Sequence, residues 1–217
     1  MIYLDTAASY PVLPEVKLAL SQAFDSYYAN SASGHLLGKQ VSDEVNRVRE
    51  QLADEIGAYP SEIVFTSGAT ESNNIAFKSL LLGGGVANNK KHIVTTQIEH
   101  KCVFAICDYL KSIGYVITYV KPNKHGIIEP ESIASALRPE TALVSVMHVN
   151  NELGTINPIA GIGQICFDAG VLFHSDAAQS FQKIEIDVDD MNVDVMSLSA
   201  HKIGGPKGIG AIYIRDL

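Results

Sequence analysis

The sequence is short of basic residues and of long apolar runs, and each shortage excludes a class of protein. Its 217 residues include 16 Lys and Arg against 24 Asp and Glu, a formal net charge of −8. This acidic balance provides no electrostatic footprint for nucleic acid or for an anionic membrane surface. No apolar run is long enough for a membrane span, and residues 1–11 lack the basic and apolar regions of a signal peptide. We therefore expect a cytoplasmic protein that binds neither nucleic acid nor membrane.

Cysteine is also scarce, with only Cys102, Cys107 and Cys166. An odd number of cysteines without framework spacing argues against a disulfide scaffold. No CxxC or Cys/His spacing is present, so we predict no metal site. Cys102 and Cys107 lie in the apolar stretch CVFAICDYL, where we interpret them as small buried hydrophobic residues.

The remaining composition is typical of a globular protein with a substantial core. Apolar residues make up 47% of the chain and charged residues 18%, which argues against disorder. The length fits one large domain, or one domain plus a fragment. There is no internal repeat, and we interpret GGGVANNKK at 83–91 as a surface loop.

Apolar periodicity alternates between helical and strand patterns. Segments 14–28 and 36–56 carry apolar residues at helical spacing, and Gly57 is a natural stop for the second. Further helices are expected at about 70–82, 100–113, 130–138 and 158–169. Seven short apolar runs are expected to be strands, at 62–66, 92–96, 115–120, 142–149, 171–177, 194–200 and 210–216. This alternation predicts an α/β fold, with three α/β/α layers around a mostly parallel seven-stranded sheet.

Polar clusters follow several strands, where open α/β sheets bind ligands. The cluster TSGATESNN at 66–74 follows one strand and opens a helix. Gly68, Ala69 and Thr70 would then lie at a helix N-terminus, where free N–H groups favour an anion such as phosphate. An ordinary Ser/Thr/Asn helix cap explains the same residues. Neither GxGxxG nor the P-loop pattern GxxxxGK[ST] is present.

Two further clusters contain candidate ligands. Asp176 in SDAAQ ends an apolar strand, where it is either a turn residue or the partner of a cationic ligand group. Asn150 and Asn151 follow the run ALVSVMHV and are open to the same two interpretations, as turn residues or as ligand contacts.

The stretch SLSAHKIGGPKGIG at 197–210 places Lys202 at the end of a strand. Burial disfavours an ammonium group, so the position calls for a functional reason. Ser199 and Lys202 match the SxxK nucleophile pattern, but that pattern needs one turn of helix, and no KTG accompanies it. The glycines and proline that follow are poor helix formers. A lysine near a phosphate cradle and an aspartate fits a Schiff base to pyridoxal 5′-phosphate (PLP) better.

Taken together, these segments resemble the cysteine desulfurases, among the fold-type I PLP-dependent enzymes related to class V aminotransferases. The segments occur in family order over essentially the whole chain, and their combination is specific although each alone is weak. The matching segments are YLDTAAS, NSASGHLLG, EIVFTSGATESNN, IEH, HVNNELGTINPI, HSDAAQS and SLSAHKIGGPKGIG.

The resemblance implies a role for each matching residue. Lys202 would bond covalently to the cofactor and later move the substrate Cα proton, and Asp176 would pair with the pyridine nitrogen. Gln179 would hydrogen-bond the cofactor 3-oxygen, and His100 would stack on the ring and serve as an acid or base. The other expected contacts are Ala69, Thr70, Ser199 and His201 with the phosphate, and Asn150 with the substrate carboxylate or the cofactor edge.

The implied reaction removes sulfur from L-cysteine, leaving alanine and an enzyme persulfide for iron–sulfur clusters or thio-modifications. A homodimer that passes sulfur to an acceptor or scaffold protein is implied as well, and segment 36–56 lies in a region that often contributes to such dimers. A parent enzyme that is a selenocysteine lyase, or another class V aminotransferase or lyase, is an alternative.

The sequence departs from the family in its length. We expect residues 1–13 to be a segment that normally packs on the small domain, residues 14–217 to be an incomplete PLP-binding large domain, and the C-terminal small domain to be absent. The persulfide-forming cysteine and the arginine that binds the substrate carboxylate would be absent with this domain. None of Cys102, Cys107 and Cys166 matches the family's position for the persulfide-forming cysteine. We predict no desulfurase turnover by the isolated chain, and a non-catalytic PLP-binding or dimerisation fragment is the alternative function.

Overall fold

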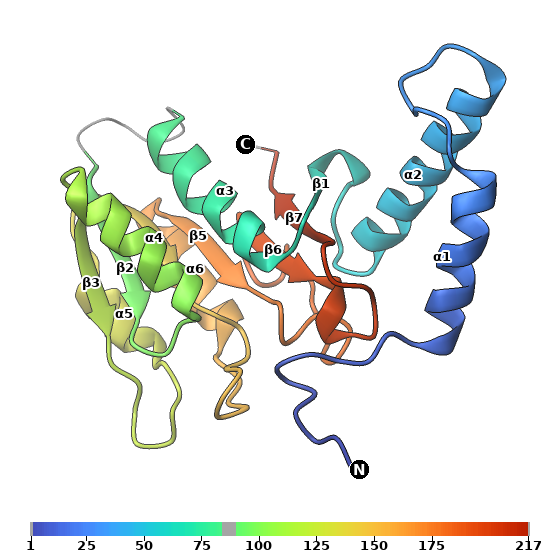
Figure 1. Ribbon diagram of the computed structural model, residues 1–217. Coiled ribbons are helices and arrows are strands. Elements are labelled where there is room, and N and C mark those ends of the chain that lie inside the picture. Colours follow the sequence, from blue (N-terminus) through green and yellow to red (C-terminus); the bar gives the residue numbers. More distant parts are fainter. Residues whose placement is uncertain (1, 84–89, 217) are drawn as a thin grey trace.

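A seven-stranded sheet forms the centre of the computed structural model, which describes residues 2–83 and 90–216. The strand order is β1-β7-β6-β5-β4-β2-β3 (Figure 1). Every strand that the sequence predicts is present, so the expected α/β fold is confirmed. The strands are β1 (Ile63–Thr66), β2 (His92–Thr96), β3 (Val116–Val120), β4 (Thr141–Ser145), β5 (Leu172–Asp176), β6 (Val195–Ser199) and β7 (Gly210–Ile214).

The sheet is mostly parallel, as predicted. Strands β2 to β6 pair in parallel, whereas β7 is antiparallel to both β6 and β1. Parallel neighbours place their carboxyl ends at the same edge of the sheet, so the segments that follow them gather there. The sheet topology therefore concentrates the polar clusters at one edge.

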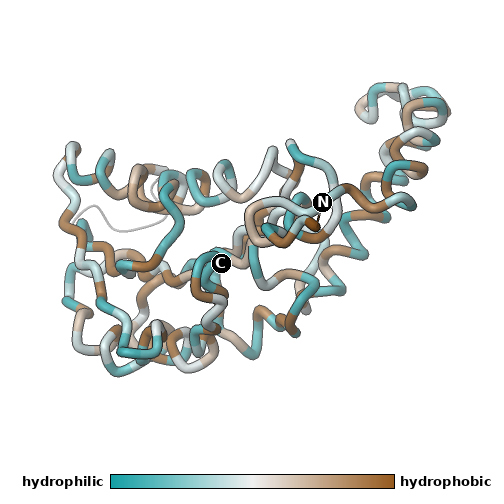
Figure 2. The backbone as a smooth tube through the Cα atoms, turned by 60° about the horizontal axis from the view of Figure 1, so that its bottom comes forward, coloured by the Kyte–Doolittle hydropathy of each residue, from teal (hydrophilic) through white to brown (hydrophobic). Residues whose placement is uncertain are grey.

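Helices cover both faces of the sheet, and Figure 2 shows a helical layer on each side of the strands. One apolar cluster joins α3 and α4 to the sheet through Phe77, Leu110 and Leu143. A second joins α5 and α6 to the opposite face through Ile133 and Ile162. The helices are α1 (Pro14–Ser26), α2 (Leu36–Asp54), α3 (Ala69–Leu82), α4 (Lys101–Ser112), α5 (Pro130–Ala136) and α6 (Ile159–Ala169), with 3-10 turns η1 (Pro60–Glu62) and η2 (Ala200–Lys202).

Helices α1 and α2 lie at one end of the molecule, away from the two helical layers (Figure 1). The apolar face of 14–28 does form a helix, but α1 has no buried residue. Leu18 is 61% exposed and Phe24 is 80% exposed. The periodicity therefore identifies this helix correctly, but within the described chain nothing covers its apolar face.

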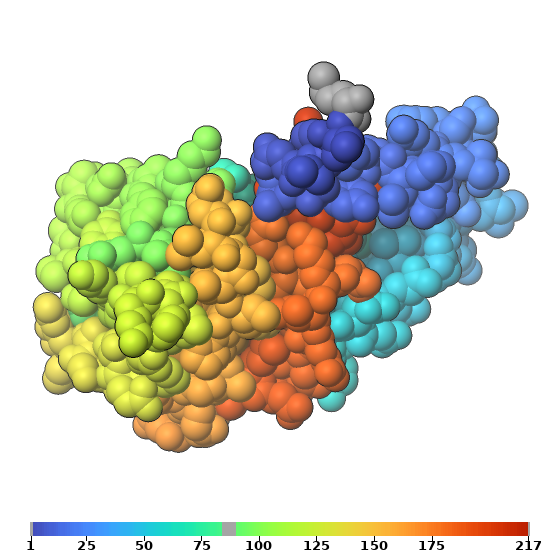
Figure 3. Space-filling view, turned by 90° about the horizontal axis from the view of Figure 1, so that it is seen from below, coloured from blue at the N-terminus to red at the C-terminus, as the bar shows by residue number. Residues whose placement is uncertain are grey.

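The N-terminal segment before α1 crosses the edge of the sheet where the polar clusters gather. Figure 3 shows it lying against residues from the last third of the chain. The Tyr10 amide donates to the His201 carbonyl at 3.0 Å, and the Leu13 amide donates to the Gly204 carbonyl at 3.0 Å. These bonds attach the segment to the loop that carries Lys202.

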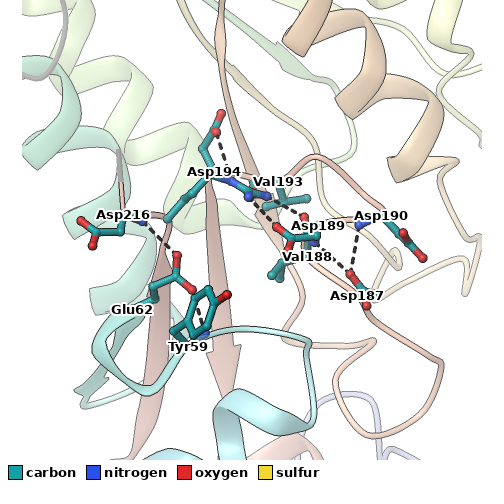
Figure 4. Close-up of polar contacts among 10 residues, drawn as sticks. Tyr59, Glu62, Asp187, Val188, Asp189, Asp190, Val193, Asp194 and Asp216 are labelled. Carbon is teal, nitrogen blue, oxygen red and sulfur yellow. Dashed lines mark hydrogen bonds and ion pairs between the residues drawn. The ribbon is translucent and has the colours of Figure 1, made fainter.

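Arg215 fixes the far end of β7 to the loop between β5 and β6. Its guanidinium donates to the carbonyl oxygens of Val188 at 2.9 Å and Val193 at 3.0 Å. It also forms ion pairs with Asp189 at 2.5 Å and Asp194 at 3.7 Å (Figure 4). These contacts attach the end of β7 to the loop that leads into β6. The predicted loop at 83–91 lies largely outside the described residues.

Candidate functional site

One cavity of about 1030 Å³ lies at the carboxyl edge of the sheet. Its lining comes from segments far apart in the sequence, including the N-terminal segment, the start of α3, and the loops after β2, β4, β5 and β6. All nine side chains that the sequence predicts as site residues line it: Ala69, Thr70, His100, Asn150, Asp176, Gln179, Ser199, His201 and Lys202.

The N-terminus of α3 forms one wall of this cavity. Gly68 is the residue before the helix, with φ of 146°, and no side chain caps the helix. The alternative of an ordinary polar cap therefore does not apply. The first N–H groups of the helix are available to an anion, and the positive end of the helix dipole favours one.

Strand β7 approaches this turn so closely that a side chain is excluded at Gly210. A Cβ atom there would lie 2.7 Å from the Gly68 Cα and 2.5 Å from the Leu198 carbonyl oxygen. Such distances are well inside van der Waals contact. The turn before α3 therefore depends on glycine at two positions, one in the turn and one in the strand behind it.

Asp176 ends β5 and is buried at the bottom of the cavity. Its carboxylate accepts hydrogen bonds from Asn73 Nδ2 at 2.8 Å and from the Ala178 amide at 2.9 Å. Burial raises the pKa of Asp176 and outweighs these bonds, which lower it. Asp176 forms no ion pair with any described residue. A cation at this position would relieve the cost of burying the charge.

Lys202 lies in the 3-10 turn η2, directly after β6. Its Nζ donates hydrogen bonds to the carbonyl oxygens of Ala7 at 2.7 Å and Ala8 at 2.8 Å. Burial lowers the pKa of Lys202, and the charge of Lys183 lowers it further. Ser199 ends a strand, so the SxxK arrangement on one helical turn does not form. The amine is thus closer to its reactive, unprotonated form than an ordinary lysine.

His100 is the residue before α4, and its ring faces the start of that helix. Its Nδ1 accepts the Cys102 amide at 3.3 Å and lies 3.0 Å from the Cys102 Sγ. Cys102 is half-buried and lines the cavity, whereas Cys107 is buried in the core. The interpretation as a buried hydrophobic residue is confirmed for Cys107 and holds only in part for Cys102, which packs against the core but also faces the cavity at the first turn of α4.

Gln179 connects the cavity to the N-terminal segment. Its Nε2 donates to the Ala7 carbonyl at 2.7 Å, and its Oε1 accepts from Lys183 Nζ at 3.2 Å. Because a lysine can only donate, it fixes which end of the amide faces it. Sequence reasoning missed Lys183, because residues 178–183 form turns and not a helix, so no regular spacing pointed to this contact.

Asn150 lines the cavity and is also a turn residue. Its Oδ1 accepts the amides of Glu152 at 2.9 Å and Leu153 at 2.8 Å. Its Nδ2 donates to the Ile98 carbonyl at 2.8 Å. The turn interpretation of Asn150 is therefore confirmed, and its ligand contact stays a prediction. Asn151 also lines the cavity, and its Nδ2 donates to the Glu152 side chain at 2.8 Å.

Ser199 and His201 stand together beside Lys202. The Ser199 Oγ lies 3.5 Å from the His201 Nδ1. Burial lowers the pKa of His201, with further lowering by the charges of Lys202 and Lys207. A cluster of two lysines and two polar side chains at this end of the cavity suits an anionic group.

Glu99 is a buried carboxyl that sequence reasoning missed, although it directly precedes His100. Its Oε1 accepts from the Thr96 hydroxyl at 2.8 Å and from the Met147 amide at 2.9 Å. Its Oε2 is buried and has no partner among the described residues. Burial raises the pKa of Glu99 to about 8. The sequence did contain a signal for Glu99, because it is a charged residue directly before the predicted site residue His100 and shortly after a strand.

Two features are absent from the described residues. No helix within them is both long and apolar enough to cross a membrane. No group of three or more His, Cys, Asp or Glu side chains among them is arranged to hold a metal ion.

Comparison with known proteins places this geometry in a family. The chain is 50% identical to a cysteine desulfurase of Mus musculus over 99% of its length, covering 46% of that protein. It is 49% identical to the cysteine desulfurase IscS of Tolumonas auensis over 99% of its length, covering 53% of that protein. The chain thus spans about half the length of the curated relatives it matches.

Two solved structures are similar to this chain over almost its whole length. A structure described as "SspA in complex with cysteine" superposes with a TM-score of 0.95 at 47% identity, covering 100% of this chain and 62% of the other. A "NIFS-like protein" superposes with a TM-score of 0.94 at 36% identity, covering 99% and 59%. The family described as aminotransferase class-V matches residues 2–217. The chain therefore belongs to the aminotransferase class-V family.

Proposed function

We propose that this chain is the large-domain part of a PLP-dependent cysteine desulfurase. The observation that carries the proposal is the convergence of nine predicted site residues, from segments between 69 and 202, on one cavity. The names of the relatives and of the structural neighbour with bound cysteine support it. The substrate would be L-cysteine and the products alanine and a persulfide.

The residues of the cavity fit PLP. The free N-terminus of α3 suits its phosphate, and buried Asp176 lacks a cationic partner such as the protonated pyridine nitrogen. Lys202 lines the same cavity and offers an amine with a lowered pKa. When bound, PLP supplies an electron sink for the carbanion formed at the substrate Cα.

Each residue has a distinct task in this proposal. Lys202 would attach the cofactor through its amine and would carry the proton to and from the substrate Cα. Asp176 would hold a proton on the pyridine nitrogen, and Gln179 would donate a hydrogen bond to the cofactor 3-oxygen. His100 would cover the ring and direct its Nε2 to the substrate. Thr70, Ser199 and His201 bind the phosphate together with the Ala69 amide.

Covalent trapping tests the proposal directly. PLP is added to the purified chain, the adduct is reduced with borohydride, and the modified residue is located by peptide mass spectrometry. We expect modification of Lys202 together with a visible absorbance band, and neither in Lys202→Ala. A Lys124→Ala variant is the matched control, because Lys124 is exposed and does not line the cavity. Adduct spread over surface lysines, and unchanged in Lys202→Ala, would contradict the proposal.

Whether the isolated chain releases alanine from L-cysteine is a different question from whether it binds PLP. The persulfide-forming cysteine and the carboxylate-binding arginine are not among the matching residues of this chain. We therefore expect PLP binding without release of alanine from L-cysteine above the level of a Lys202→Ala control. Release from L-selenocysteine alone would favour a selenocysteine lyase, and a PLP-binding module without turnover is the second candidate function.

Homodimer formation in the cytoplasm and transfer of sulfur to an acceptor protein are further parts of the proposal. The exposed apolar side chains of α1 and α2, such as Phe24 and Leu36, support an association through this end. Light scattering of the purified chain measures its oligomeric state, and a monomer at all concentrations would count against the dimer.

A further inference from the structure

A continuous chain of hydrogen bonds connects the two sides of the cavity. Asn73 Nδ2 donates to Asp176 Oδ2 at 2.8 Å and to Cys102 Sγ at 3.2 Å. The Cys102 Sγ lies 3.0 Å from His100 Nδ1. Asn73 is fully buried on α3, and neither it nor Cys102 has a role in the proposed function.

The direction of each bond follows from the chemistry of its atoms. A carboxylate only accepts, so the amide nitrogen of Asn73 must face Asp176. The second hydrogen of the same nitrogen points to the Cys102 sulfur, which therefore accepts there. The single hydrogen of the thiol is left for His100 Nδ1. Burial raises the pKa of Cys102, which favours this protonated thiol.

The backbone fixes the remaining choice at His100. The Cys102 amide donates to the same Nδ1 at 3.3 Å, and a backbone N–H has no alternative role as an acceptor. A proton on Nδ1 would point at this amide hydrogen. The lone pair of Nδ1 is instead shared by the amide and the thiol, so the proton of the neutral ring lies on Nε2.

We propose that Asn73 and Cys102 are positioning residues that hold neutral His100 in its Nε2–H form and tie it to the Asp176 carboxylate. Nδ1 is occupied, and Nε2 has no hydrogen-bond partner among the described residues. His100 therefore presents a hydrogen-bond donor to the cavity. For the proposed function, on which this meaning rests, neutral His100 donates a hydrogen bond from Nε2 to the bound cofactor or substrate and offers no lone pair at that nitrogen to act as a base.

Nitrogen NMR of the histidine rings tests the proposal on the full chain without cofactor. The chain has seven histidines, and the His100 signals are those lost in His100→Gln. For the neutral ring of His100 we expect a pyridine-type Nδ1 and a pyrrole-type Nε2. A pyrrole-type Nδ1 would overturn the assignment.

Variants then test the contribution of the two positioning residues. Cys102→Ala and Asn73→Ala should bring the two ring nitrogen shifts closer together, because the second tautomer becomes populated. Cys102→Ser should preserve the separation, because a hydroxyl also accepts from Asn73 and donates to His100. Cys107→Ala is the matched control, since Cys107 lies on the same helix without contact to His100 and its loss should leave these shifts unchanged.

The outcomes separate this proposal from the proposed function. Unchanged His100 shifts in both Cys102→Ala and Asn73→Ala would overturn the positioning role, whether or not PLP binds. Failure of PLP to bond to Lys202 would overturn the proposed function and leave the ring assignment in place. A variant that loses its fold is recognised by its amide spectrum, and the Cys102→Ser and wild-type spectra then decide the question.

Discussion

Lys202 Nζ donates a hydrogen bond to the carbonyl oxygen of Ala7 at 2.7 Å, joining residues 195 positions apart. The bond places the N-terminal segment over the amine that we propose to bind the cofactor. Covalent attachment would use this same nitrogen, so the amine has to leave the carbonyl before it reacts. Cofactor binding and the order of the N-terminal segment are therefore coupled.

Removal of the Lys202 amine should loosen the N-terminal segment. In Lys202→Met we expect faster hydrogen exchange at the amides of residues 8–13, because two of the bonds that hold the segment are lost. Mass spectrometry of the N-terminal peptide measures the rate. Lys207→Met is the control, and equal exchange in the two variants would contradict the coupling.

Loss of the Lys183 charge should raise the pKa of Lys202. Burial and the charge of Lys183 both lower it, so Lys183→Met leaves burial as the main cause. We expect covalent attachment of PLP at neutral pH to slow several-fold and its pH profile to move to higher pH. Lys183→Arg keeps the charge and should keep the profile. Identical profiles for Lys183→Met and the unmodified chain would refute this prediction.

Buried Glu99 should make the chain less stable as pH rises. Below pH 4.5 the carboxyl is protonated in both the folded and the unfolded chain, but between about 4.5 and 8 only the folded chain keeps the proton. The free energy of unfolding therefore falls across this window, on the order of 2–4 kcal/mol, and levels off above it.

Glu99→Gln should remove this contribution, because the amide cannot ionise and still accepts at Oε1. Urea denaturation at several pH values measures the change, with exposed Glu131→Gln as the control. A fall in stability that persists unchanged in Glu99→Gln would show that another group causes it.

The three cysteines should differ sharply in reactivity. Burial raises the pKa of Cys107 and of Cys166 to about 12, so neither thiol is reactive at neutral pH. Cys102 lines the cavity, and we expect slow modification there alone, further slowed by bound PLP. Peptide mapping after treatment with a thiol reagent checks the site. Modification of Cys166 in the folded chain would contradict the burial described here.

A methyl group at Gly210 should disrupt the turn before α3. It would meet the backbone of Gly68 and Leu198, which can move only if the strand or the turn moves. We expect Gly210→Ala to lower the free energy of unfolding by about 1–3 kcal/mol and to weaken PLP binding. Gly34→Ala, with open space at its Cβ position, is the control. Equal PLP affinity in both variants would disprove the link to the anion site.

Local periodicity was sufficient to predict the sheet and its helices. Strands β2, β4 and β6 are short runs buried along their whole length, and β5 is buried except at its first residue. Their apolar pattern can be recognised without any contact information. Their positions at strand ends singled out Lys202 and Asp176, the resemblance implied their roles, and parallel strands bring the segments after them to one edge. These properties depend on spacing and residue type, which the sequence contains directly.

Only the tertiary structure decided how the site residues are connected. The contact of Asn73 with Asp176 spans 103 positions, and that of Lys202 with Ala7 spans 195. The exposure of α1 and the opening of Cys102 onto the cavity likewise depend on what packs beside them. Such contacts arise from the packing of distant segments, so no local pattern encodes them, and they determine which protons and charges face the cavity.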